Sequence, residues 1–222
     1  MDPHAIRPGL FHWTAAHPKI RIEVSSYWLA HAKVLLDPLL PVGGLDWLRE
    51  MGPPEHVILT NRHHWRHCSE IVGVFGCPVW CNELGLQELD GEPGRERVRG
   101  FRAGDRLPGG IESHEVGVLC PDETALRFDL PEGGACLALA DAVVRMGEAA
   151  RGDGPLAFVP DSLIADEPGR VEPVKRGLRE ACRRLCDLEW DTLLLAHGLP
   201  LAGDGKEKLR AFAGAPDPGP GL

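Results

Sequence analysis

The 222-residue sequence predicts an α/β fold, and three patterns lead to this prediction. Residues 56–81 alternate between strand-like and helix-like segments, an order typical of layered α/β sheets. Residues 98–139 contain strand-like runs in succession, separated by turn residues. Residues 172–190 carry apolar side chains at the period of a helix that buries one face. Together these patterns favour layers of sheet and helix.

Length and composition favour a single globular domain over residues 1–222. Hydrophobic residues make up 43% of the chain and charged residues 26%, which excludes the disordered, collagen-like and coiled-coil classes. Residues 1–8 and 214–222 lie outside the patterned part, and we expect both segments to be flexible.

Charge and the length of the apolar runs exclude further classes. Thirty-three acidic and 24 basic residues give a net charge of −9, which disfavours nucleic acids and anionic membrane surfaces as partners. The apolar runs are far shorter than the ~20 residues of a membrane helix, and the first residues do not resemble a secretion signal. We therefore expect a cytoplasmic protein with a small-molecule substrate or ligand. The sequence leaves the oligomeric state open.

The first half of the chain is predicted to open with a hairpin. The segments at 20–31 and 33–40 are rich in β-branched and aromatic residues. Residues 41–52 predict a short helix that stops at Gly52, before two prolines. The elements that follow are a buried strand, a helix and a second strand, at residues 56–60, 69–76 and 77–81.

Glycine and proline turns separate the predicted strands of the second half. These strands lie at residues 97–105, 111–120, 123–130 and 135–140. The helix at 172–190 has its apolar face at Val174, Leu178, Ala181, Leu185 and Leu188. A buried strand at 192–196 and a final helix at 205–214 complete the pattern.

The seven cysteines are odd in number and lie mostly in apolar runs, which indicates reduced thiols rather than a disulfide framework. The pairs Cys77/Cys81 and Cys182/Cys186 lack the two-residue spacing of a zinc knuckle. We therefore assign the cysteines to packing.

Histidines and an aspartate follow the ends of predicted strands, where α/β proteins place ligand and metal groups. His63, His64 and His67 lie in the turn after the strand at 56–60, and His197 follows the strand at 192–196. Gly198 allows the backbone to turn sharply behind that imidazole. The other two candidates are His114 and Asp141, which lie within and after strands of the second half.

Three histidines and a carboxylate gathered from strand ends suit a divalent metal such as zinc, with one position open to water. Each residue also has a plainer interpretation. A histidine at a strand end is often only a hydrogen-bonded residue, and Asp141 is a suitable N-cap for a following helix.

The order of these parts resembles the metallo-β-lactamase superfamily. The similarity runs from about Gly9 to Phe212: an opening hairpin that ends Val-Leu-Leu-Asp-Pro, a strand and a histidine-rich turn, His-x-x-Gly, a strand followed by Asp-Ala, and a strand followed by His-Gly. The resemblance implies a four-layer αββα sandwich with a metal cleft at one edge of two sheets.

The family's main motif, Thr-His-x-His-x-Asp-His, is degenerate in this alignment. Starting the motif at Thr60 places Asn61, His63, Trp65 and Arg66 on its four functional positions, and only His63 matches. His114 looks like the family's third motif, Asp141 like its bridging aspartate, and His197 like its last metal histidine. The resemblance also implies that Asp37 orders neighbouring loops.

The resemblance therefore implies a metal site at His63, His114, Asp141 and His197, with Asp141 also catalytic. One divalent cation is expected, zinc before iron or manganese, because Arg66 places a permanent positive charge where a second ion would lie. His67, Asn61, Trp65 and Arg66 are possible additional members. His64 is expected to be exposed or to support a ligand, because neighbours in an extended turn point apart.

Two functions remain open at this point. The first is a metal-dependent hydrolase of a small ester, thioester or phosphoester with at most a mononuclear site. The second is a metal-free, catalytically degenerate protein whose Arg66 and Trp65 recognise a small anion, or which serves as an interaction module. Substrate choice is expected to depend on loops over the cleft, at residues 84–104 and 152–170.

Overall fold

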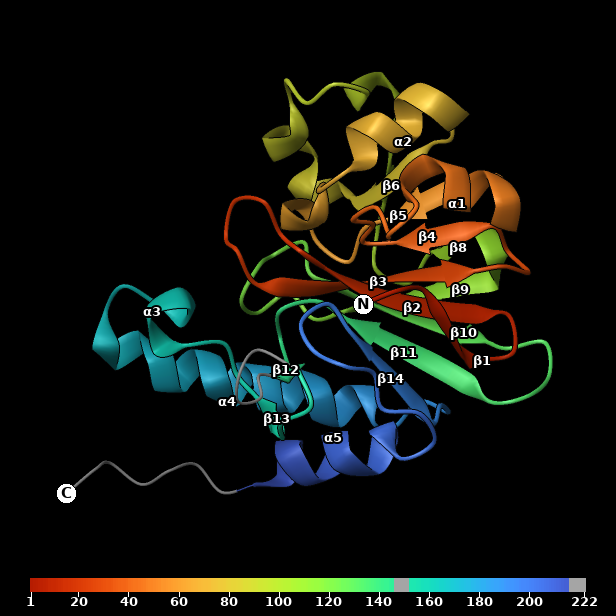
Figure 1. Cartoon of the computed structure of the whole chain (residues 1–222). Coiled ribbons are helices and arrows are strands. Elements are labelled where there is room, and N and C mark those ends of the chain that lie inside the picture. Colours follow the sequence, from red (N-terminus) through yellow and green to blue (C-terminus); the bar gives the residue numbers. More distant parts are fainter. Residues whose placement is uncertain (146–151, 216–222) are drawn as a thin grey trace.

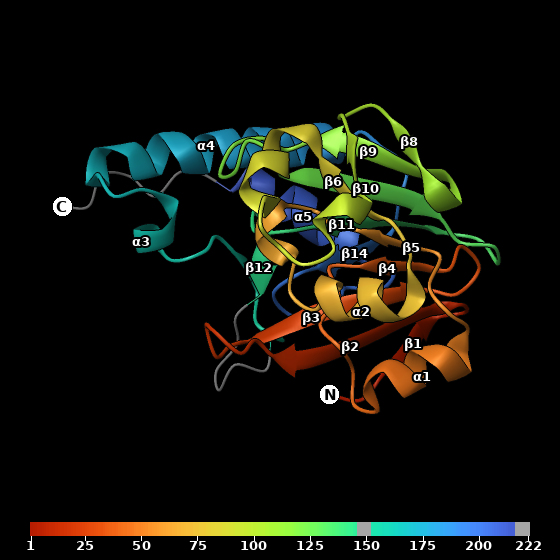
Figure 2. The same ribbon diagram turned by 90° about the horizontal axis from the view of Figure 1, so that it is seen from above.

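The computed structural model describes residues 1–145 and 152–215. Two β-sheets pack face to face, with helices α1 and α2 above one sheet and helices α4 and α5 below the other (Figure 1). This arrangement confirms the predicted αββα sandwich, and Figure 2 shows the same layers from above.

Within the described residues, the first sheet has seven strands in the order β1-β2-β3-β4-β5-β6-β7. Its strands are β1 (His4–Arg7), β2 (Leu10–Ala16), β3 (Glu23–Leu29), β4 (Val34–Leu36), β5 (His56–Ile58), β6 (Val79–Asn82) and β7 (Val98–Phe101). Strands β1 to β4 pair antiparallel, and β4 to β7 pair parallel. The ends of β4 and β5 therefore lie at the same edge of the sheet.

The second sheet has the order β14-β11-β10-β9-β8 among the described residues. Its strands are β8 (Arg106–Leu107), β9 (Ile111–Glu115), β10 (Thr124–Asp129), β11 (Ala135–Leu139) and β14 (Thr192–Leu195). Only β11 and β14 pair parallel, so the residues that follow these two strands also meet at one edge. A small hairpin pairs β12 (Val144–Arg145) with β13 (Leu156–Ala157).

The helices cover the outer faces of both sheets. Their bounds are α1 (Gly44–Met51), α2 (Cys68–Phe75), α3 (Asp161–Ile164), α4 (Pro168–Leu185) and α5 (Gly205–Gly214). Short 3₁₀ turns lie at Arg62–His64, Glu83–Leu89, Arg95–Arg97 and Pro108–Gly110. Helix α4 begins earlier than the predicted helix, because Pro168 occupies its first turn, where a missing N–H costs nothing.

Alternation along the strands produces separate apolar layers. In β3, Tyr27 and Leu29 face the second sheet, whereas Trp28 faces the layer beneath α1 and α2. In the second sheet, Leu126 faces the first sheet and Ala125 faces α4. Burial of each such large side chain contributes about 1.5–3 kcal/mol, so the four layers are stabilised by three apolar interiors.

The N-terminal segment differs from the expectation that residues 1–8 are flexible. Strand β1 pairs with β2, and Arg7 donates a 2.8 Å hydrogen bond to Asp191 beside the second sheet. These contacts position the segment across the edge of the sandwich. At the other end, α5 extends to Gly214, and residues 216–222 of the expected flexible tail lie outside the described residues.

All seven cysteines are buried and free, which confirms their assignment to packing rather than to disulfides. Burial raises the pKa of every one of these thiols. None of the helices within residues 1–145 and 152–215 combines the length and apolar composition that crossing a bilayer requires.

His12 is a buried histidine on β2, far in sequence from the candidate residues. Its Nε2 lies 3.0 Å from Ser25 Oγ, and its Nδ1 has no partner among the described residues. Burial and the nearby His4 lower its pKa from 6.5 to about 3, so this imidazole is neutral in the folded protein.

Replacing His12 with glutamine is expected to make the fold more resistant to acid. Between pH 6.5 and about 3 the unfolded chain binds a proton at His12 that the folded chain does not bind, so stability falls as the pH falls. Glutamine takes up no proton. As the pH falls through this window, the free energy of unfolding of His12→Gln should therefore rise relative to that of the parent, by up to about 1.4 kcal/mol per pH unit. Denaturant titrations of the parent and the variant from pH 7 to pH 4 measure this difference in stability. A difference that does not change with pH would contradict the prediction.

Candidate functional site

The candidate residues gather where strands of both sheets end. The turn that contains Asn61 and the histidines follows β5, Asp141 follows β11, and His197 follows β14. As predicted from the strand ends, the structure brings Asp141 and His197 together: His197 Nε2 lies 3.0 Å from Asp141 Oδ1.

A buried aspartate at the end of β4 organises the turn after β5. Asp37 Oδ1 accepts a 2.9 Å hydrogen bond from the Thr60 backbone N–H, and Oδ2 accepts one of 2.6 Å from the Thr60 hydroxyl. His64 Nδ1 lies 3.0 Å from the same Oδ2. The expectation that Asp37 orders neighbouring loops agrees with these contacts.

Asn61 begins the 3₁₀ turn at Arg62–His64 and fixes its direction. Its side-chain oxygen accepts a 2.9 Å hydrogen bond from the His63 N–H, in the manner of an N-cap. Its amide nitrogen donates a 2.8 Å bond to Asp141 Oδ2. The buried Asp122 accepts from the Arg62 backbone N–H at 2.7 Å and pairs with its guanidinium. The start of the turn is therefore tied to residues that flank β10 and β11 of the second sheet.

Three side chains converge as one group: His64, Asp141 and His197. One possible ligand atom from each lies within 4.8 Å of the other two. His64 Nε2 lies 3.6 Å from Asp141 Oδ1, on the opposite side of the ring from Asp37. The His64 imidazole thus bridges two carboxylates.

The electrostatics of the group are dominated by burial and by these paired charges. Burial alone would lower the pKa of His64, but Asp37 and Asp141 raise it to about 9. Burial alone would raise the pKa of Asp141, but His64 and His197 hold that pKa well below its usual range. At neutral pH the structure therefore favours a protonated His64 between two carboxylates.

Arg66 adds a second, half-buried cation next to the group. Its Nη1 donates hydrogen bonds of 2.7 Å to the Ser25 carbonyl and 2.5 Å to the Asp37 carbonyl. Burial lowers the pKa of this guanidinium, whereas Asp37 and Asp141 oppose the shift, and an arginine remains charged in any case. Its backbone φ of 44° lies in the left-handed region, which is uncommon for a side chain of this size.

Strand β3 positions the segment that carries His197. The Ser25 N–H donates to the Ala196 carbonyl at 2.9 Å, and the Ser25 hydroxyl donates to the Gly198 carbonyl at 2.8 Å. The Tyr27 hydroxyl donates to the Leu195 carbonyl and accepts from the Leu195 N–H. Gly198 has φ 114°, and a Cβ there would lie 2.5 Å from the Arg145 carbonyl, so the sharp turn predicted behind His197 requires glycine.

The structure differs from the sequence-based choice between His63 and His64. His63 is exposed, whereas His64 is buried and belongs to the converging group. The expectation assumed an extended turn, but the chain forms a 3₁₀ turn, which directs the second imidazole toward Asp141. His64 is therefore the member that sequence reasoning missed.

His114 does not lie with the group. It pairs across β9 and β10 with Ala125, so both side chains are on the face of the sheet that packs against α4. Its Nε2 lies 3.7 Å from Glu112 Oε2. Alternation along β9, in which Ile111 and Ser113 are buried, explains this placement.

Two of the possible additional residues have structural contacts. Trp65 packs in the apolar layer with α2 and donates a 3.0 Å hydrogen bond to Ser69, so its indole does not line the cleft beside Arg66. His67 precedes α2, and its Nδ1 accepts a 2.9 Å bond from the Leu40 N–H. Asn61 and Arg66, by contrast, lie next to the group.

Glu123 is a further buried acid that the sequence did not single out. Its Oε1 accepts a 2.7 Å hydrogen bond from the Ala142 N–H, next to Asp141, and Oε2 has no partner among the described residues. Burial and the Asp141 charge raise the pKa of Glu123 to about 8. A glutamate in Pro-Asp-Glu-Thr resembles any turn residue, so no local pattern marked it.

The group lies in a pocket of about 600 Å³, a volume typical of small-molecule sites. His64, Arg66, Asp141 and His197 line it together with the exposed His63. Of the two loops expected to cover the cleft, residues 152–170 contribute lining side chains, and residues 84–104 contribute none to this pocket within the described chain.

The donor set fits a divalent cation. Two imidazoles and one carboxylate are a common ligand set for catalytic zinc and for non-haem iron. The contact between His64 Nδ1 and Asp37 is the carboxylate support that metal-binding histidines commonly have, and it directs Nε2 toward Asp141. A cation here must replace the proton on His64, because metals bind the neutral ring.

Comparison with solved structures identifies the fold. A B3 metallo-β-lactamase with an active-site glutamic acid superposes with a TM-score of 0.66 at 17% identity, covering 96% of this chain and 86% of the other. An archaeal metallo-β-lactamase superfamily protein from Sulfolobus tokodaii gives a TM-score of 0.66 at 13% identity, with 92% and 84% covered. A Thermotoga maritima flavoprotein gives 0.65 at 15% identity, with 95% and 60% covered.

These likenesses show that the chain has the metallo-β-lactamase fold, as the resemblance implied. No protein-family model matches the sequence, and no curated protein matches it.

Replacing Asp37 with asparagine is expected to lower the free energy of unfolding by about 3–5 kcal/mol at pH 7, because it removes the buried carboxylate that faces the His64 ring and offsets the charge of Arg66, and leaves only Asp141 to oppose both cations. Urea denaturation measures the change. Asp46→Asn is the matched control, since the Asp46 side chain is 82% exposed and should change stability by less than about 0.5 kcal/mol. Equal effects of the two substitutions would contradict the role of Asp37.

Proposed function

We propose that this protein is a metal-dependent hydrolase of a small ester, thioester or phosphoester, and that His64, Asp141 and His197 bind one divalent cation. The observation that carries the proposal is the convergence of these three donors within 4.8 Å in a pocket of substrate size. Zinc suits the two nitrogens and one carboxylate best, and iron or manganese accepts the same donors.

The chemistry of the site divides between the cation and the protein. A bound divalent cation polarises a carbonyl or phosphoryl oxygen and lowers the pKa of water toward about 7. Asp141 Oδ1 faces both imidazoles, while Asn61 donates to Oδ2 and fixes the plane of the carboxylate. Asp37 orients the His64 ring, and Arg66 places a positive charge where negative charge develops on the substrate.

Metal content of the chain and its variants tests the proposal. Protein expressed with zinc, iron and manganese available should contain about one equivalent, from the single group of donors within residues 1–145 and 152–215. His197→Ala should remove most of the metal, together with chelator-sensitive hydrolysis of simple esters. His63→Ala and His114→Ala are matched controls, because both imidazoles lie outside the group.

Elemental analysis of the parent and the three variants, at pH 7.5, is the measurement. A parent without metal, or equal metal loss in His63→Ala and His197→Ala, would contradict the proposed ligands. Two equivalents would contradict the mononuclear site.

A second candidate function, binding of a small anion without metal, is favoured by one observation. Arg66 Nη2 is buried in the described structure without a hydrogen-bond partner, and the Arg66 side chain lines the pocket. A guanidinium nitrogen in this position suits a carboxylate or phosphate oxygen.

For this candidate, inorganic phosphate should bind to chelator-treated protein, and Arg66→Met should abolish the binding measured by calorimetry. The exposed Arg49→Met is the control, because Arg49 pairs with Asp46 outside the pocket. Unchanged phosphate binding in Arg66→Met would exclude the guanidinium as the receptor.

A further inference from the structure

The walls of the pocket differ in character from its floor. The floor contains the polar group, whereas the walls are built from apolar side chains of segments far apart in sequence. Ile20 and Ile22 come from the turn between β2 and β3, Leu119 from the loop after β9, and Val159, Leu163 and Ile164 from α3 and the residues before it.

The polar atoms of the pocket already have partners within the protein, with few exceptions. Asp141 contacts His64, His197 and Asn61, and Arg66 Nη1 donates to two carbonyls. Among the described residues, no lysine or glutamate lines this pocket. Outside the floor, the titratable side chains that line the pocket in the described residues are His17, His63 and Cys120, so the walls contain no permanently charged side chain.

Two wall residues are unusually exposed for their size. Ile20 is 55% exposed and Leu163 is 68% exposed, although both are large and apolar. They belong to different elements and line one pocket. Apolar side chains gathered at the mouth of a polar site are typical of a surface that a ligand covers.

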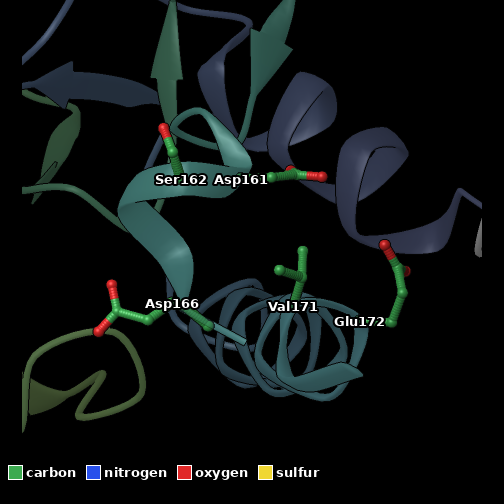
Figure 3. A pocket seen from close by; sticks show the side chains of 6 residues that line it. Asp161, Ser162, Asp166, Val171 and Glu172 are labelled. Carbon is green, nitrogen blue, oxygen red and sulfur yellow. The ribbon is translucent and has the colours of Figure 1, made fainter. Parts of the chain in front are cut away.

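The residues of helix α3 line two different pockets. Leu163 and Ile164 line the main pocket, whereas Asp161 and Ser162 line a smaller one of about 300 Å³ beside α4 (Figure 3). Asp161 forms a 2.8 Å ion pair with Lys175 of α4, and Ile164 is buried. The apolar flank of α3 is thus directed toward the main pocket by contacts on its other side.

We infer that these walls bind the apolar acyl chain of an ester or thioester, so that the scissile carbonyl lies above His64, Asp141 and His197. This inference rests on the proposed hydrolase and narrows its substrates. Water adds its oxygen to the acyl carbon, the bond to the alcohol oxygen or thiol sulfur breaks, and the leaving group takes the proton. A pocket of about 600 Å³ accommodates a chain of medium length.

Binding of octanoate and butanoate to chelator-treated protein tests the subsite without any reaction. Each buried methylene group strengthens binding roughly fourfold, and octanoate has four more than butanoate, so it should bind up to about 250-fold more tightly by calorimetry. Leu163→Asp and Ile20→Asp should each weaken octanoate binding at least about tenfold. Leu84→Asp is the matched control, because Leu84 is also 68% exposed but does not line the pocket.

Hydrolysis of nitrophenyl octanoate and nitrophenyl butanoate by the metal-loaded protein separates this inference from the proposed function. A preference for the eight-carbon compound over the four-carbon compound, in both binding and hydrolysis, supports the subsite. Octanoate binding without hydrolysis supports the subsite and overturns the hydrolase. Hydrolysis without chain preference overturns the subsite and leaves the hydrolase standing.

Two further results overturn the acyl subsite. One is an equal loss of octanoate binding in Leu84→Asp and Leu163→Asp. The other is a parent protein that forms a dimer and does not bind octanoate, together with a Leu163→Asp variant that is monomeric. The exposed apolar residues would then be the contact with a second copy of the chain.

Discussion

A buried carboxylate, Asp37, joins the end of β4 to the turn after β5, and the candidate group takes its shape from this contact. Removing a carboxylate from water is costly unless donors surround it. Here the Thr60 backbone and hydroxyl and the His64 ring supply them. Satisfying Asp37 therefore fixes the turn, and the fixed turn leaves the other nitrogen of His64 facing Asp141. The charges then alternate from Asp37 through His64 to Asp141.

The site depends equally on how the two sheets meet at this edge. The Thr124 N–H of β10 donates to the Thr60 carbonyl at 2.8 Å, so the turn after β5 is tied to the opposite sheet. Tyr27 and Ser25 of β3 reach across to the residues around His197 in the same way. These bonds cross the interior between sheets, where an unpaired polar group would cost about 1–3 kcal/mol. The group is thus assembled from strands of both sheets, and neither sheet alone contains it.

Much of this arrangement is predictable from sequence. Hydrophobic periodicity and element order indicated layers of sheet and helix, and the resemblance to the metallo-β-lactamase superfamily implied the αββα order. Asp141 and His197 followed from their places after buried strands, because β11 and β14 are parallel neighbours whose ends meet. The choice of His63 over His64 failed because a 3₁₀ turn rotates neighbouring residues differently from an extended one. The assignment of His114 to the metal site failed because side chains alternate along β9, so that His114 points away from the face that carries the buried Ile111 and Ser113. Helix α3 was missed because four residues are too few for a helical period, and its position depends on Lys175 of another helix.

The burial of all seven cysteines has a consequence for how the chain behaves once it unfolds. In the native protein each thiol is shielded and its pKa is raised, so little thiolate is present and exchange with oxidants is slow. Unfolding exposes the seven thiols together, and an odd number cannot pair completely within one chain. Non-native disulfides and cross-linked chains then compete with refolding in air. The recovery of the native state after denaturation is accordingly governed by reductant in the buffer, even though all seven thiols are buried and unpaired in the folded protein.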